Sequence, residues 1–339
     1  MKNVYHKWRR RIRDRLRRRV SETELFEELT FSMLQMLHVP LNEAERLART
    51  AAARRAKMDQ LVRSGEPDRA LSAFRQMRLP LDLAEVTREL ESHGAESYLL
   101  ALPMTVSSVA LLAHLVEDAH RRFCIINTSF TRFYFHPFLA GGTRERVQLL
   151  TSAEIIAHNR GRGERPNADA VTYVTFPDHQ TSRRETMWCL PFLGEDYEFS
   201  ALDPVLFYRG LSPLFTFDAR DFASTGRLKL IAYQDAAVSH EATELNVRAL
   251  LAWLVGHIEN VFRQNPTDVL AWSETQMRAS RMRARAIVVK LKLVEGYLRV
   301  WKAADPKLNA ETYVRSIAEL GKLQESANAP EKARAAGVR

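Results

Sequence analysis

The sequence predicts an α/β fold in which a mixed sheet is flanked by helices, with helical extensions at both ends of the chain. Three observations predict it. Between residues 96 and 236, short apolar and β-branched runs alternate with helical patterns. Before this region a long helical segment lacks Gly and Pro, and after it the pattern is again helical. With 339 residues and 46% apolar content, the chain is long enough for one large domain with additions.

The first half of the chain begins with a mostly helical region, residues 21–117. Asn42 is the expected N-cap of an Ala-rich helix that ends near residues 64–67, and Pro80 stops the helix that follows. Next come a buried strand, a helix, a second strand and a loop with a glycine pair, at residues 96–103, 107–123, 123–130 and 141–142.

The second half adds three strands and then becomes helical. The strands are predicted at residues 170–176, 211–219 and 228–236. Helical patterns follow from residue 243 to about 324. We therefore expect four segments: a basic amphipathic helix, the α/β domain, a C-terminal helical extension and a disordered tail, at residues 1–20, 21–278, 279–325 and 326–339.

The basic character of the protein is concentrated in residues 1–20. This segment holds ten Lys or Arg and one Asp, so it carries the whole net charge of +9. Its apolar residues recur every four positions and would form a narrow stripe on a helix: Val4, Trp8, Ile12, Leu16 and Val20. Such a helix suits an anionic membrane surface, with Trp8, Arg9, Arg10 and Arg11 as contacts. A solvated helix is the alternative; nucleic-acid binding is not expected, because the rest of the chain is electrically neutral.

Several classes of protein are not indicated. The most apolar window, residues 98–116, contains Pro103 and His114 and is interpreted as buried core rather than as a membrane span. No signal-peptide pattern opens the sequence. Cys124 and Cys189 form no zinc-like cluster, so neither a metal nor a cofactor is expected. We expect a cytoplasmic protein, peripheral on the inner face of the cell membrane.

Four stretches, in this order, are similar to motifs of one family. They are LHVPLNEAERLAR (37–49), FPDHQ (176–180), LPFLG (190–194) and IENVFRQNPTDVLAW (258–272). They resemble, respectively, a helix start, a strand-end Pro-Asp-Gln, a Pro-Phe-Phe-Gly turn and a closing Asn-Pro…Trp segment. The family is that of the bacterial lipid A biosynthesis acyltransferases, within the lysophospholipid-acyltransferase-like superfamily. The resemblance implies a glycerolipid-acyltransferase-like fold and transfer of an acyl group from an acyl carrier protein thioester to a hydroxyl.

The family places a His, four residues and an Asp or Glu where a strand runs into a helix, as base and orienting carboxylate. In this sequence Met104 and Val109 occupy those positions, and residues 99–113 contain no His, Asp or Glu. A literal His-x4-Glu, His38 to Glu43, lies about sixty residues too early and is interpreted as coincidence.

His179 and Asp178 are the alternative catalytic candidates. They follow a strand at the edge where α/β sites usually form, and an imidazole titrates near neutrality. In this interpretation His179 removes the acceptor's proton, with Asp178 or Glu185 orienting it. The other interpretations are a structural turn, with Asp178 accepting backbone N–H groups and His179 in solvent, and ligand binding without catalysis.

Asn127 and Arg132 are loose matches to acceptor-facing residues of the family, in a segment expected to be a loop. A phosphate, a carboxylate or phosphopantetheine could bind there. Asn127, Arg132 and Met104 are the predicted substrate-binding residues. The aromatics around them, such as Phe130 and Phe135, would line an acyl chain or belong to the core. The prediction is acyl transfer from a thioester of acyl carrier protein or CoA to an amine or hydroxyl, in lipid or specialised-metabolite biosynthesis. The alternative is an inactive homologue that binds an acyl chain or carrier protein.

Overall fold

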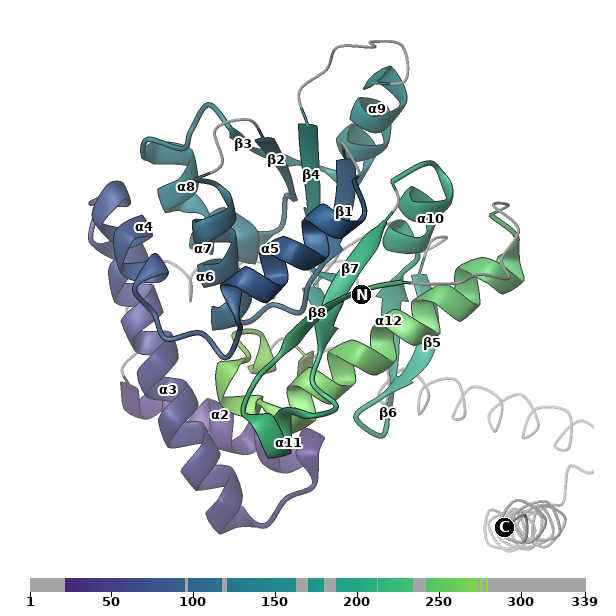
Figure 1. The fold of residues 1–339 in the computed structure, drawn as a ribbon. Helices are drawn as coiled ribbons and strands as arrows, with labels where there is room; N and C mark the ends of the chain where they lie inside the picture. Colours follow the sequence, from purple (N-terminus) through teal and green to yellow (C-terminus); the bar gives the residue numbers. More distant parts are fainter. Residues whose placement is uncertain are drawn as a thin grey trace, which may run out of the picture. The chain divides into compact units, whose positions relative to one another are not determined.

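The computed structural model describes residues 22–94, 97–117, 121–162, 170–179, 187–211, 213–233, 242–273, 275, 276 and 279. Within them the fold is α/β, with a mixed six-stranded sheet flanked by helices, as the sequence predicts (Figure 1). Neighbouring strands from β3 to β7 are parallel, and β8 pairs antiparallel with β7. In spatial order the strands are β3 (Val147–Leu150), β2 (Arg121–Ile126), β4 (Ala170–Thr175), β1 (Ser97–Ala101), β7 (Leu214–Asp218) and β8 (Lys229–Ala232).

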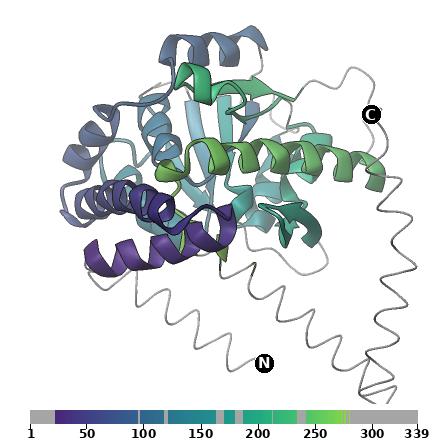
Figure 2. The same cartoon turned by 90° about the horizontal axis from the view of Figure 1, so that it is seen from below.

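Helices cover both faces of this sheet, and α2 and α3 pack side by side (Figure 2). The helices are α2 (Glu22–Leu37), α3 (Leu41–Arg63), α4 (Pro67–Arg75), α5 (Leu83–Ser92), α6 (Val106–Leu115), α7 (Ser129–Tyr134), α8 (His136–Ala140), α9 (Ser152–Arg162), α10 (Leu202–Tyr208), α11 (Phe222–Thr225) and α12 (Glu244–Gln264).

Side chains alternate between the two faces of the sheet along each strand, and their contacts show which helices pack on which face. Tyr173 and Thr175 point to one face of β4, where they contact α9 and α10 through His158 and Asp203. Asp218, on the same face by register, contacts α12. On the opposite face, Phe215 packs edge-on against Tyr98 and against His93, the residue after α5. Because β2, β4, β1 and β7 are parallel, their carboxyl ends meet at one edge of the sheet, between these two helical layers.

Capping residues explain where the helices begin, and they correct two expectations. Helix α3 begins at Leu41 after Pro40, so Asn42 lies in its first turn and is not its N-cap. The predicted strand 123–130 ends at Ile126, because Thr128 caps α7 through a reciprocal bond with Thr131. The segment that carries Arg132 is therefore a helix, not the expected loop.

The Pro-Phe-Leu-Gly stretch belongs to a β-hairpin that the sequence analysis recognised only as a turn. Strands β5 (Met187–Phe192) and β6 (Glu195–Ser200) pair antiparallel, joined by Leu193 and Gly194. Both residues have positive φ, 54° and 83°, as the two central residues of a type I′ turn require. Phe192 packs against Tyr197 and against Phe262 of α12, which anchors the hairpin to the domain.

The expected segments at the two ends of the chain are largely not described by the structure. The predicted basic helix (1–20), the tail (326–339) and, apart from Ala279, the C-terminal extension (279–325) lie outside the described residues. Among the described helices, none has the length and apolar character needed to cross a bilayer.

The hairpin turn gives a paired test of backbone conformation. We expect Gly194→Ala to lower the free energy of unfolding by about 1–2 kcal/mol, because a Cβ disfavours its left-handed conformation. Space is not the obstacle, since the nearest atom to that Cβ would be His38 Nε2 at 3.6 Å. Gly256, exposed on α12 with nothing within 4 Å, is the control: Gly256→Ala should stabilise by about 0.5–1 kcal/mol. Urea unfolding measures both; equal effects would contradict the explanation.

Candidate functional site

The site expected from the family resemblance is the crossing from β1 into α6, residues 102–108. Thr105 caps α6 by accepting the Ser108 N–H at 3.1 Å, and Ser108 Oγ donates to the Pro103 carbonyl at 2.6 Å. Met104 and Val109, in the positions of the family's base and carboxylate, are fully buried members of the hydrophobic core. Met104 therefore contributes packing and backbone groups here, and its side chain presents no exposed surface to a substrate.

Asp178 holds this crossing from the side of β4. It lies in the short 3₁₀ turn Pro177–His179 (η1) and is 1% exposed. The Met104 N–H donates to both of its carboxylate oxygens, at 3.1 Å each. The Tyr197 hydroxyl donates to the backbone carbonyl of Asp178 at 3.1 Å, which ties the β5–β6 hairpin to the same point. Asp178 thus accepts a backbone N–H, as in the structural interpretation of this turn.

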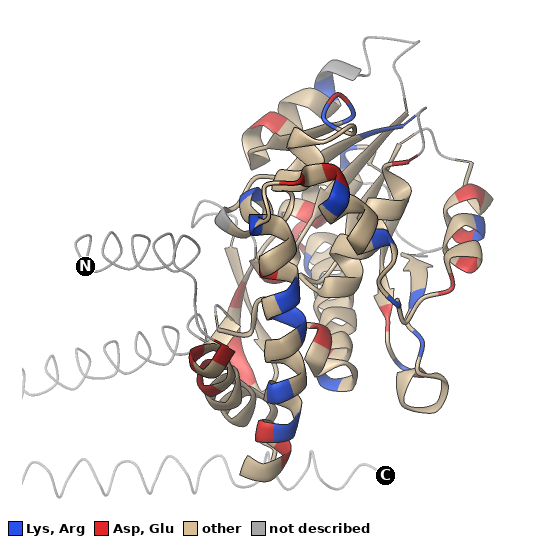
Figure 3. Ribbon diagram, turned by 90° about the vertical axis from the view of Figure 1, so that its left-hand side faces the viewer, with Lys and Arg blue, Asp and Glu red and all other residues tan. Residues whose placement is uncertain are grey.

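Asp268 holds the crossing from the segment that follows α12. It belongs to the 3₁₀ turn Pro266–Asp268 (η3) after α12 and accepts the Ser107 N–H at 3.2 Å. Next to it, the Leu270 N–H donates to the Met104 carbonyl at 2.9 Å. Arg54 Nη1 lies 3.5 Å from Asp268, and belongs to α3, which carries a row of Lys and Arg (Figure 3). Burial raises the pKa of the Asp268 carboxyl, and the Ser107 hydrogen bond and Arg54 oppose that rise.

His179 lies in the core beneath α7. It is 6% exposed, which contradicts the alternative in which its side chain points to solvent. Its ring centroid lies 4.4 Å from that of Phe130, and the Arg55 guanidinium lies over the same phenylalanine, 5.8 Å from its centroid. Phe130 and Phe135 are fully buried, as expected of core aromatics. A role for His179 as a base stays a prediction.

Asn127 and Arg132 are brought together at the carboxyl end of β2. Arg132 Nη2 donates to Asn127 Oδ1 at 3.2 Å, and the Arg132 side chain is exposed. Since Asn127 follows the strand and Arg132 lies one turn into α7, the two present a guanidinium at the sheet edge. Such a group can bind a phosphate or carboxylate.

The sequence analysis missed a buried histidine–carboxylate pair at the end of β7. His257 Nδ1, on α12, lies 3.4 Å from Asp218 Oδ1, and both side chains are at most 10% exposed. Arg220 Nη2 lies 2.8 Å from Asp218 Oδ2. Burial lowers the pKa of His257, against the attraction of Asp218. Burial alone would raise the pKa of Asp218, but hydrogen bonds from Arg220 outweigh it and hold that pKa below its usual value. At neutral pH the pair therefore consists of a neutral imidazole and an ionised carboxylate.

Comparison with known proteins adds no assignment: neither the protein-family models nor the curated proteins gave a match to this sequence. In the part of the chain that the structure describes, no three His, Cys, Asp or Glu side chains gather in a way that would hold a metal ion.

The role of Asp178 as a support can be measured. Asp178→Ala leaves the buried Met104 N–H without its carboxylate acceptor, and we expect it to lower the free energy of unfolding by about 1–3 kcal/mol. Asp178→Asn keeps one carbonyl oxygen at the same position, so it should lose less than half as much. Denaturant unfolding of both variants tests this, and a harmless Ala variant would rule out the supporting role.

Proposed function

We propose that this protein transfers an acyl group from a thioester, carried by acyl carrier protein or CoA, to an amine or hydroxyl acceptor, on an acyltransferase-like fold. One observation carries the proposal: Asp178 and Asp268 converge on residues 104–107. Each comes from a stretch that resembles the acyltransferase family. Both stretches support the strand-to-helix crossing where that family builds its site, although Met104 and Val109 replace the reactive pair.

The chemistry follows from the reactants. A neutral alcohol attacks a thioester poorly and needs a base, whereas a deprotonated amine attacks readily. Neither Met104 nor Val109 accepts a proton. Either a base at the end of another strand removes the acceptor's proton, or the acceptor is an amine that attacks without one. The exposed Asn127–Arg132 pair offers a cation at the same sheet edge for the phosphate of the donor's phosphopantetheine or for an anionic acceptor.

A second function is favoured by the burial of Met104 and Val109. A homologue whose reactive positions have become core residues would bind an acyl chain or carrier protein without catalysis. It would act as an accessory factor in the same biosynthetic setting.

Turnover of the thioester separates the two functions. We expect the full chain to release thiol from acyl carrier protein or acyl-CoA thioesters faster than the background only when an amine or hydroxyl acceptor is present. Thiol release and product mass measure this. Arg132→Ala should raise KM for the anionic substrate about tenfold, since one charge-assisted hydrogen bond is lost. If no donor and acceptor pair exceeds background but acyl carrier protein binds, the accessory function replaces acyl transfer.

Membrane attachment through residues 1–20 is part of the proposal. Deleting this segment removes its net charge of +9, and each cation near an anionic surface contributes about 1 kcal/mol. We expect the full chain to pellet with phosphatidylglycerol vesicles and the deletion variant to remain in the supernatant. Replacing Arg9, Arg10 and Arg11 by Gln should have an intermediate effect, and high salt should release the full chain. Unchanged pelleting of the deletion variant would contradict the attachment.

A further inference from the structure

We propose that His257 is the general base of this acyl transfer, with Asp218 as its positioning residue; the inference rests on the proposed function. The acceptor's reactive group would then approach the carboxyl end of β7, the strand next to β1 in the sheet.

The geometry is that of an oriented base. His257 Nδ1 lies 3.4 Å from Asp218 Oδ1, an electrostatic contact that falls short of hydrogen-bond geometry in this structure. With Nδ1 on the carboxylate side, Nε2 is the nitrogen we assign to accept the proton. Asp218 is itself fixed, because Arg220 donates from Nε to both carboxylate oxygens, at 3.0 and 2.9 Å. The Trp253 ring packs edge-on against the imidazole, with centroids 4.6 Å apart, and limits its rotation. The carboxylate and the indole thus restrict the orientation of the imidazole from two sides.

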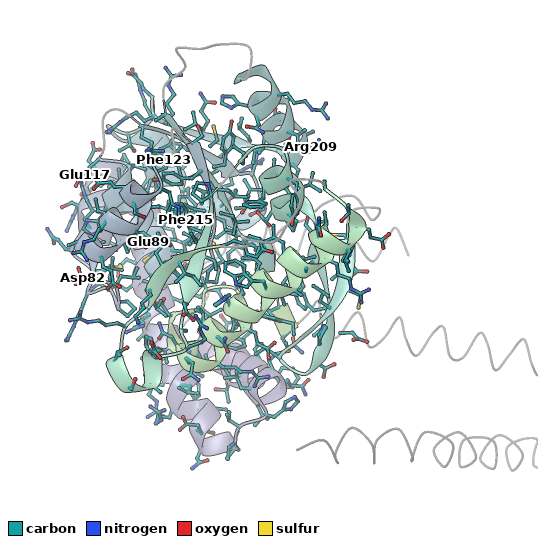
Figure 4. The ribbon with its side chains drawn as sticks, turned by 45° about the vertical axis from the view of Figure 1, so that its right-hand side comes forward. Asp82, Glu89, Glu117, Phe123, Arg209 and Phe215 are labelled. Atoms are coloured by element: carbon teal, nitrogen blue, oxygen red, sulfur yellow. The ribbon has the colours of Figure 1, made fainter. Side chains whose placement is uncertain are left out.

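The His257–Asp218 pair lies next to the crossing from β1 into α6, where Met104 and Val109 offer no base. Register places Asp218 at the same sheet edge as residues 102–104, because Leu99 pairs with Leu214 and the two strands are parallel. Another histidine of the described residues that contacts a carboxylate is His93, 3.5 Å from Glu89. That pair lies at the end of α5, on the face of Phe215 rather than that of Asp218; Glu89 and Phe215 are labelled in Figure 4. His93 therefore serves as a matched control.

The surroundings indicate the class of acceptor. From His257 a row of half-buried aromatic rings runs through Trp253 and Tyr233 to Phe207 on α10, with neighbouring centroids 4.6, 5.0 and 5.5 Å apart. Such a surface favours an amine or hydroxyl on an apolar or aromatic molecule over a strongly charged sugar.

The step balances within the named groups. The acceptor's proton passes to His257 Nε2 while its oxygen or nitrogen forms a bond to the thioester carbonyl carbon. The C–S bond then breaks, and the leaving thiolate takes the proton back from Nε2, which restores the neutral imidazole. Asp218 stabilises the imidazolium in between and remains ionised.

The test compares variants of the full chain with a thioester donor and an acceptor amine or alcohol. We expect His257→Gln to lower kcat by about 10²- to 10⁴-fold with little change in KM, as loss of a general base does. His93→Gln should stay within about threefold of the wild type. His179→Gln is measured alongside: a larger loss there than in His257→Gln would overturn the inference and assign the base to His179.

The pH profile provides a readout that a merely structural role would not move, and it does not depend on His257→Gln folding. The charged groups shown to act on His257 are Asp218, which raises its pKa, and Arg220, which lowers it. Removing the first in Asp218→Asn should therefore shift the acidic limb of kcat to lower pH. An unshifted limb would overturn the proposal. Absence of turnover in the wild type itself would instead remove the proposed function, and with it the base.

Discussion

The structure depends on satisfying the backbone N–H groups where β1 runs into α6. The residues of this crossing are buried, and an N–H group removed from water needs an acceptor. Asp178 supplies one for Met104 and Asp268 another for Ser107, from segments far along the chain. Arg54 extends the connection to α3, and Leu270 closes it with a bond to the Met104 carbonyl. The crossing is thereby fixed between β4, η3 and α3.

This constraint gives a structural role to two of the stretches that resemble acyltransferase motifs. The Pro-Asp-His and Asn-Pro…Trp stretches each supply an acceptor for a buried backbone N–H group of the crossing. Within the second stretch, Trp272 Nε1 also donates a hydrogen bond to the Pro266 carbonyl. Both stretches therefore support the architecture independently of any catalytic role. In a parallel sheet the strand ends meet at one edge, so a base can be supplied from a neighbouring strand. The buried imidazole of His257, beside the end of β7, is in a position compatible with such a base.

The sequence predicted the parts of the fold that depend on local pattern. The strands at Ala170–Thr175 and Leu214–Asp218 were predicted because apolar runs between breakers depend on nearby residues. The N-cap predicted at Asn42 was wrong because Pro40, with its fixed φ, is the N-cap two residues earlier and α3 begins at Leu41. The strand that precedes Asp178 was predicted, but the hydrogen bond from the Met104 N–H to Asp178 was not, because a side chain that meets a backbone group leaves no spacing signal in the sequence. His257 and Asp218 were missed for the same reason: one lies in a helix, the other ends a strand, and only the packing of α12 on β7 brings them together.

The environments of two carboxylates separate support from reactivity. Asp268 is fully buried, and burial raises its pKa although the Ser107 hydrogen bond and Arg54 oppose that rise. The folded-state pKa of Asp268 therefore lies above its unfolded-state value. Asp268 contributes stability below the unfolded-state pKa, and this contribution is lost as the pH rises from the unfolded-state pKa through the folded-state pKa. Asp218 has the opposite balance: burial alone would raise its pKa, but the hydrogen bonds from Arg220 outweigh burial and hold that pKa below its usual value. An ionised carboxylate is what an imidazole needs when it takes up a proton. Of these two acids, Asp218 is the one that faces a histidine, and its ionised form can stabilise an imidazolium.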